Sequence, residues 1–182
     1  MKELSLHILD LAQNSVEAGA RKLTIVIDED LAADRLTITI TDDGAGMDAE
    51  TVRRVVDPFV TTRTTRRFGL GLPLLDAATQ RCAGRLVIQS APGQGTKVAA
   101  EFQHSHIDRA PLGDLGATLA TIIAANPDLE LDYLHRIDGR SFQLSTRELR
   151  ARVGEIPLSH PEIILWIREY VAQELQQLRG GV

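Results

Sequence analysis

Apolar and polar residues alternate in two neighbouring segments, KLTIVIDE (residues 22–29) and RLTITITD (residues 35–42). Such alternation places every second side chain on the same face of a β-strand, so both segments are predicted to be strands with one buried face. The short polar segment DLAAD separates them, which favours an antiparallel hairpin. Two more strands are expected in RLVIQS and TKVAAEFQ, which are joined by the glycine-containing turn APGQG. The chain is therefore expected to fold around a sheet that helices cover.

Helices are predicted on both sides of these strands in the sequence. Residues 3–18 carry apolar side chains at helical spacing, and the helix is expected to stop at Gly19, a residue suited to the left-handed conformation. A short helix with Asp48 as its N-cap follows the second strand, and another runs from residue 70 or 72 to residue 83. On the first helix a stripe of polar side chains lies outside the apolar arc, formed by His7, Asp10, Asn14 and Glu17.

The sequence pattern changes after His104. Residues 105–114 have the composition of a linker, and a helix that stops before Pro127 comes next. A hairpin is then expected to turn at the Asp-Gly pair of residues 138–139. Two final helices follow, and each is preceded by a Ser-x-x-Glu capping box, Ser145 with Glu148 and Ser159 with Glu162.

This change of pattern predicts two units, residues 1–104 and residues 105–182. The second unit would be a small α+β extension in which the sequence shows no chemical motif. Its expected roles are to complete the core, to pair two subunits in a homodimer, or to dock a protein client.

Composition and charge exclude several kinds of partner. The 182 residues carry a formal net charge of −5, which argues against a nucleic-acid partner because phosphate backbones are held by basic surfaces. The single cysteine, Cys82, cannot form an internal disulfide, and the amino terminus lacks the pattern of a secretion signal. No apolar stretch approaches the roughly 20 residues needed to cross a bilayer. We therefore expect a cytoplasmic protein without a membrane segment.

Glycines cluster at three places, DDGAGM (residues 42–47) after a strand, FGLGLP (residues 68–73) before a helix, and PGQGT (residues 92–96) between strands. Each cluster by itself is more typical of an ordinary turn than of a ligand site. A glycine-rich segment that enters a helix can also direct free N–H groups towards an anion. The polar stripe has two interpretations as well. Most such stripes are solvated faces, but an asparagine amide with a carboxylate one turn away also suits Mg²⁺.

Taken in chain order, these features resemble the Bergerat-fold ATP-binding domain. They are the polar stripe, a strand ending in Asp-x-Gly-x-Gly, the arginine-rich RTTRR, Gly-Leu-Gly before a helix, and Gly-x-Gly-Thr. Histidine kinases, anti-sigma-factor kinases, DNA gyrase, the MutL repair proteins and the ninety-kilodalton heat-shock chaperones share this domain. The resemblance covers about residues 1–104, and PFVTTRTTRRFGLGLPLL followed by GQGT is most similar to histidine kinases. It implies an α+β sandwich, with a mixed, mostly antiparallel sheet covered by helices on one face, and ATP and Mg²⁺ as cofactors.

The resemblance also implies roles for individual residues. Asn14 takes the position of the Mg²⁺ ligand, and Asp10 takes that of the catalytic residue that orients or deprotonates the attacking group. Asp42 would accept a hydrogen bond from the adenine amino group. The other positions implied to contact the nucleotide lie in the glycine loops and in the lid between them, namely Gly44, Gly46, Thr61, Thr62, Arg63, Gly69, Leu70, Gly71 and Thr96.

Two positions depart from the family pattern. Position 10 is aspartate where the ATP-hydrolysing branches carry the longer glutamate, so hydrolysis is expected to be weak at most. Arg67 stands where histidine kinases usually have the first glycine of Gly-x-Gly-Leu-Gly. Conventional histidine kinases carry, before this domain, a helical hairpin with the histidine that accepts the phosphoryl group, and we expect this chain to lack it. The five histidines of the sequence are interpreted as ordinary surface or partly buried residues.

The expected function is therefore that of a signalling kinase that phosphorylates a partner protein in trans. The alternatives are an ATP-gated binding module that transfers no phosphoryl group, and a scaffold that has lost ATP binding.

Overall fold

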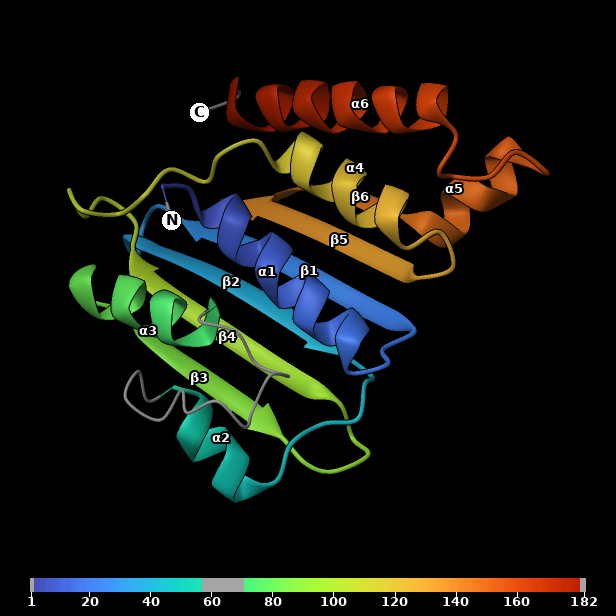
Figure 1. The fold of residues 1–182 in the computed structure, drawn as a ribbon. Coiled ribbons are helices and arrows are strands. Elements are labelled where there is room, and N and C mark those ends of the chain that lie inside the picture. The colour runs from blue at the N-terminus through green and yellow to red at the C-terminus, as the bar shows by residue number, and fades with distance from the viewer. Residues whose placement is uncertain (1, 57–70, 181–182) are drawn as a thin grey trace.

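The computed structural model describes residues 2–56 and 71–180 as a six-stranded sheet with helices packed against it (Figure 1). The helices are α1 (Leu4–Glu17), α2 (Ala49–Val55), α3 (Gly71–Arg81), α4 (Leu115–Ala125), α5 (Thr146–Val153) and α6 (Pro161–Gly180). The strands are β1 (Lys22–Asp30), β2 (Arg35–Asp42), β3 (Arg85–Ser90), β4 (Thr96–Gln103), β5 (Glu130–Ile137) and β6 (Arg140–Ser145). Among the described residues, no helix has the length and hydrophobicity needed to cross a membrane.

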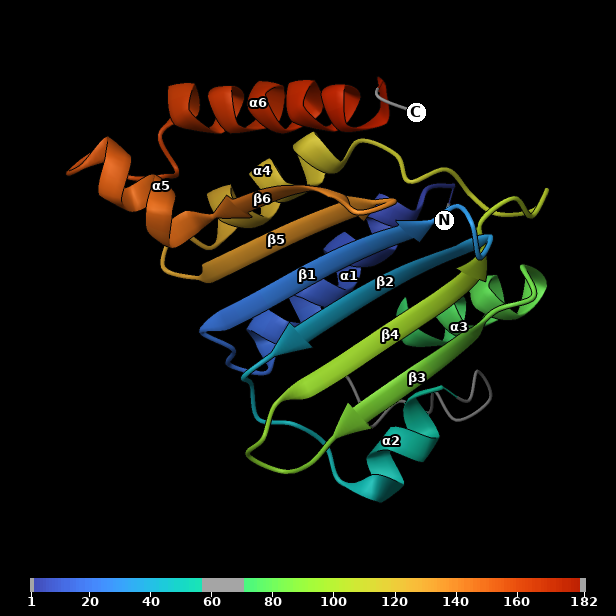
Figure 2. The same ribbon diagram turned by 180° about the vertical axis from the view of Figure 1, so that it is seen from behind.

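The sheet has the strand order β3-β4-β2-β1-β5-β6. All neighbouring strands are antiparallel except β1 and β5, which are parallel. Helices α1, α3 and α4 lie over one face, and α6 packs on the outside of α4 (Figure 1). Seen from behind, the other face of the sheet has no helix over it in the described part of the chain (Figure 2). The predicted sandwich, with a mixed and mostly antiparallel sheet covered on one face, is confirmed.

The strands from residues 105–182 belong to the same sheet as those from residues 1–104. β5 pairs in register with β1, from Lys22 opposite Glu130 to Glu29 opposite Ile137. Apolar side chains from both parts of the chain form one hydrophobic core, because α4 packs beside α1 on the covered face. The extension therefore completes the sheet and the core across the boundary that was predicted at residue 104.

Several local signals acted as predicted. α1 ends at Glu17, and Gly19 has a φ of +79°. The Asp48 side chain accepts a hydrogen bond from the Thr51 N–H at 2.7 Å and so caps α2.

The capping box predicted at Ser145 is wrong, because the Ser145 hydroxyl donates to Asp132 Oδ1 at 2.8 Å and makes no cap bond. In the β5–β6 hairpin Ser145 lies opposite Asp132, and its hydroxyl bonds to that residue instead of to the helix end.

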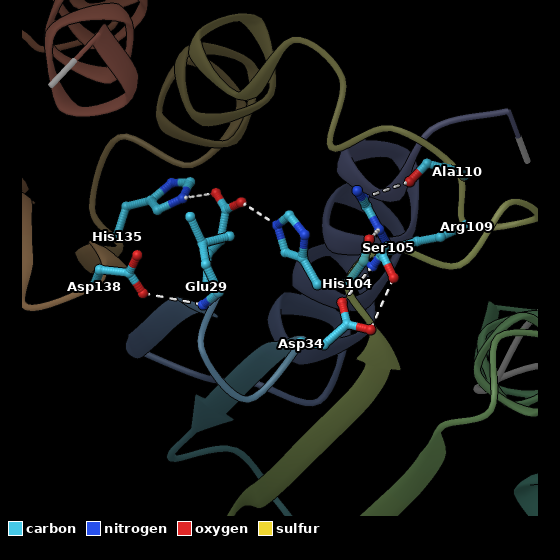
Figure 3. A network of polar contacts seen from close by, with 9 residues as sticks. Glu29, Asp34, His104, Ser105, Arg109, Ala110, His135 and Asp138 are labelled. Carbon is cyan, nitrogen blue, oxygen red and sulfur yellow. Dashed lines mark hydrogen bonds and ion pairs between the residues drawn. The ribbon is translucent and has the colours of Figure 1, made fainter. Parts of the chain in front are cut away.

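Near the carboxyl end of β1, the buried carboxylate of Glu29 connects residues 1–104 with residues 105–182 (Figure 3). Glu29 lies between two histidines, with Oε1 2.6 Å from His135 Nε2 and Oε2 2.8 Å from His104 Nε2. The Tyr133 hydroxyl lies 2.8 Å from the other ring nitrogen of His135, which is fully buried. The prediction that all five histidines are surface or partly buried is therefore wrong for His135, and it is also wrong for His7, which is 4 % exposed.

This network is expected to make stability depend on pH in the acid range. Burial opposes ionisation of Glu29, but the hydrogen bonds to His135 and His104 outweigh it and lower the pKa from 4.5 to about 2. The ionised carboxylate therefore stabilises the fold fully above pH 4.5, and this contribution is lost as the pH falls towards 2. Over that window, the wild type should lose about 3 kcal/mol more free energy of unfolding than Glu29→Gln does.

The measurement is urea denaturation at a series of pH values, followed by circular dichroism. Glu148→Gln is the matched control, because Glu148 is an exposed glutamate of α5, and it should follow the wild-type curve. If the free energy of unfolding fell equally with pH in the wild type and in Glu29→Gln, Glu29 would not be the cause of the acid sensitivity.

Candidate functional site

The features carrying the resemblance that lie in the described part of the chain come together beside the carboxyl end of β2. Asp42 is the last residue of β2 and pairs with Thr96, the first residue of β4. Asn14 and Ser15 lie in the last turns of α1 and line the same pocket as Asp42 and Thr96. The antiparallel register thus brings together residues that are far apart in the sequence.

The Asp42 carboxylate is held in place by three donors. Oδ1 accepts hydrogen bonds from the Gly44 N–H at 2.9 Å and the Thr96 N–H at 3.2 Å. Oδ2 accepts one from the Ser15 hydroxyl at 2.7 Å. These bonds fix the orientation of the carboxylate at the pocket wall, where it can accept a further hydrogen bond from a ligand.

Asp43, the neighbouring acid, has a different role. Its Oδ1 accepts hydrogen bonds from the N–H groups of Arg21 and Lys22, both at 2.8 Å. The N–H donated by Lys22 outweighs desolvation and, with that of Arg21, lowers the pKa of Asp43. Asp43 therefore fastens the start of β1, whereas Asp42 faces the pocket.

Glycines allow the two loops at this end of the sheet to touch through their backbones. A Cβ atom on Gly46, where φ is +68°, would overlap the carbonyl oxygen of Ala91, and one on Gly95 would overlap that of Asp42. The Gly93 N–H donates to the Ala45 carbonyl at 2.7 Å. Loop 43–48 and loop 91–95 therefore form one unit beside the pocket.

The polar stripe of α1 faces the start of α3. A Cβ atom on Gly71, the first residue of α3, would overlap Asp10 Oδ2, so a larger residue there would require the Asp10 side chain to move. Asp10 Oδ2 and Asn14 Nδ2 are buried and have no hydrogen-bond partner among the described residues. Burial, and secondarily the charge of Glu17, raises the pKa of Asp10. Buried polar groups normally have partners, so these atoms point to a ligand.

A second pocket, of about 300 Å³, adjoins the first and shares Asn14, Ala18 and Met47 with it. The first is mainly apolar, holds the Asp42 carboxylate and has a volume of only about 30 Å³, so a base that reached Asp42 would also occupy space beyond it. The described residues hold no group of three or more His, Cys, Asp or Glu side chains that could bind a metal. A cation here would therefore need ligands from a bound molecule as well as from Asn14, and Mg²⁺ often meets such a need with phosphates.

The predicted site residues fall into two groups. The structure brings together Asn14, Asp42, Gly44, Gly46 and Thr96 around the two pockets, with Asp10 and Gly71 beside them. The predicted residues of the lid and of the glycine segment before α3 lie outside the described part of the chain, namely Thr61, Thr62, Arg63, Gly69 and Leu70.

Two serines of the site were missed from the sequence. Ser15 donates to Asp42, and Ser90 at the end of β3 bonds to both loops. Ser15 follows Asn14 directly, and Ser90 is the last residue before the turn APGQG. Their positions next to predicted motifs were the available signals.

The first part of the chain is similar to known proteins. Residues 2–106 match the family described as histidine kinase-, DNA gyrase B- and HSP90-like ATPases. The chain is 34 % identical over 103 residues to a putative sensor protein of Shewanella frigidimarina, covering 56 % of this chain and 16 % of that protein. It is 33 % identical over 110 residues to the sensor histidine kinase YxdK of Bacillus subtilis, covering 56 % of this chain and 33 % of that protein.

A solved structure shows the same fold over a longer stretch. The ATPase domain of Aquifex aeolicus MutL, complexed with ADP, matches with a TM-score of 0.52 and 18 % identity, covering 84 % of this chain and 68 % of that one. The chain spans a third or less of the length of the two sensor proteins that it matches.

Proposed function

Because the chain belongs to the family of histidine kinase-, DNA gyrase B- and HSP90-like ATPases, we propose that it binds ATP with Mg²⁺ and transfers the γ-phosphoryl group to a partner protein. The observation that carries the proposal is the Asp42 carboxylate, fixed by three donors at the wall of the pocket. The kinship with sensor histidine kinases favours transfer to a protein as the reaction.

The residues beside the pocket suit Mg²⁺ bound through ATP. The Asn14 side chain, which lines both pockets, offers an amide oxygen, the kind of ligand that Mg²⁺ takes. When bound, Mg²⁺ supplies positive charge that offsets the charge of the phosphates. Asn14 would hold it from the protein side, with phosphate oxygens as further ligands.

The reaction breaks the bond between the γ-phosphorus and the oxygen that bridges it to the β-phosphate, and it forms a bond to a side-chain atom of the partner. Catalysis of this kind depends on positioning and on charge stabilisation. Asp10 lies against Gly71 on the stripe that also carries Asn14, and the raised pKa of its carboxyl suits it to accept a proton from the attacking group. Three of the chain's five histidines are less suited as acceptors, because His7 and His135 are buried and His104 is bonded to Glu29.

The packing of Asp10 also favours a second function. The carboxylate touches the backbone of Gly71, so α3 and α1 are in close contact next to the site. A nucleotide that changes this contact could reposition α3 and alter a partner surface without phosphoryl transfer. In this alternative the protein is an ATP-gated binding module.

Incubation with γ-labelled ATP, Mg²⁺ and cell extract separates the two functions. A kinase should label a partner, and Asn14→Ala should abolish the labelling because the cation loses its protein ligand. The control is Gln13→Ala, which changes the exposed neighbour of Asn14 in α1 and should label like the wild type. ATP binding without labelled protein would reject transfer and leave the binding module.

A further inference from the structure

The hydroxyl group of Ser90 lies where the two loops of the site meet. It accepts a hydrogen bond from the Met47 N–H at 2.8 Å and donates to the Gly95 carbonyl at 2.9 Å. Its Oγ also lies 3.0 Å from Oγ1 of Thr96, which lines the pocket beside Asp42. Ser90 therefore contacts loop 43–48, loop 91–95 and a pocket residue at once.

Counting protons fixes the direction of the Ser90–Thr96 bond. A serine hydroxyl has one proton, and a carbonyl oxygen can only accept. Because Gly95 is buried, the favoured arrangement gives the Ser90 proton to its carbonyl. Thr96 must then donate its own proton to Ser90, so its oxygen offers only lone pairs to the pocket.

The same count applies to Ser15 on the opposite wall. A carboxylate can only accept, so the Ser15 hydroxyl gives its proton to Asp42 Oδ2. Ser15 then also offers only lone pairs. The hydroxyl oxygens of Ser15 and Thr96 and the Asp42 carboxylate, which line one pocket, are therefore all acceptors.

We infer that Ser90 is a positioning residue that sets base specificity: by holding Thr96 as an acceptor, it makes the pocket select a purine with an amino group at position 6 and reject one with an oxo group. The inference rests on the proposed ATP site. A 6-amino group can donate hydrogen bonds to these acceptors. A 6-oxo group is itself an acceptor, so it cannot bond to them and its lone pairs repel theirs. Such mismatches discriminate strongly because they leave buried polar groups unpaired.

The test compares the dissociation constants of ATP and inosine triphosphate, whose base has a 6-oxo group, by calorimetry with Mg²⁺. The wild type should prefer ATP by about 100-fold or more, in the range that unpaired polar groups produce. In Ser90→Ala the Thr96 hydroxyl becomes able to donate, so this preference should fall at least tenfold. Ser90→Thr keeps a hydroxyl and should restore the preference, and Gln89→Ala, at the exposed neighbouring position of β3, should keep it.

Thr96→Val tests the same point at constant side-chain shape, because both bonds from Ser90 to the loops remain. It should also lower the preference at least tenfold. An equal weakening of both nucleotides by Ser90→Ala, or an unchanged preference in Thr96→Val, would overturn the inference. If the wild type binds ATP and inosine triphosphate equally, the inference about Ser90 is wrong but the proposed ATP site remains. If the wild type binds neither nucleotide, the proposed function is wrong.

Discussion

Asp42→Asn is expected to weaken ATP binding at least 100-fold, a loss of about 3 kcal/mol. In this variant the amide oxygen can replace Oδ1 as the acceptor for the Gly44 and Thr96 N–H groups. The amide nitrogen then replaces Oδ2, so it faces the Ser15 hydroxyl and the pocket as a donor. This side-chain amide nitrogen and the adenine amino group are both hydrogen-bond donors, so no bond can form between them. Calorimetry with ATP and Mg²⁺ should show the loss of affinity.

Asp43→Asn is the matched control for this variant. It makes the same chemical change one residue further on, where the carboxylate bonds to the N–H groups of Arg21 and Lys22 and not to the pocket. It should lower the melting temperature and leave the dissociation constant for ATP within about threefold of the wild type, a change of less than 1 kcal/mol. Equal weakening by both variants would mean that Asp42 acts on the fold and not on the base.

Gly46→Ala should lower both the free energy of unfolding and the affinity for ATP. The methyl group would overlap the Ala91 carbonyl oxygen, and φ at this position is +68°. The left-handed backbone alone costs about 1–2 kcal/mol for a residue with a side chain. Backbone atoms cannot move aside as a flexible side chain can, so loops 43–48 and 91–95 must separate, and the total loss should exceed about 3 kcal/mol.

Gly93→Ala separates the two causes. Gly93 has a similar φ of +73°, but a Cβ atom there would meet no atom within 4 Å. It should therefore show the backbone cost of about 1–2 kcal/mol alone and keep ATP binding close to that of the wild type. Urea denaturation and calorimetry on both variants provide the measurement. The packing argument fails if Gly46→Ala is no less stable than Gly93→Ala.

Structural features that depend on residues close together in the chain could be predicted well. The β1–β2 hairpin follows from strict alternation over adjacent segments, and the Asp48 cap follows from the residue type before α2. The turn at Asp138 and Gly139 also lies where predicted, with φ values of +45° and +82°. In each case the partners are close in the chain, so local preferences decide the structure.

Pairings between distant segments could not be predicted in this way. No local pattern specifies that β5 lies parallel to β1, because their paired residues are more than 100 positions apart. The burial of His135 did have a signal, since it alternates in β5 with Leu131, Tyr133 and Ile137, all of which face the core. Its partner Glu29, in contrast, comes from the distant pairing itself.

The candidate site shows the same division. Chain order suggested Asp42, Asn14 and the glycines, because these residue types recur in one sequence of motifs. The contacts of Ser15 and Ser90 depend on how α1 and β3 approach the two loops, which only the folded structure shows.

A calorimetric titration of the wild-type protein with ATP, with and without Mg²⁺, tests the central claim most directly. The single site proposed around Asp42 and Asn14 predicts one ATP per chain, and Asn14 as the proposed Mg²⁺ ligand predicts that Mg²⁺ strengthens the binding. Failure to detect ATP binding at millimolar concentration in the presence of Mg²⁺ would contradict the account.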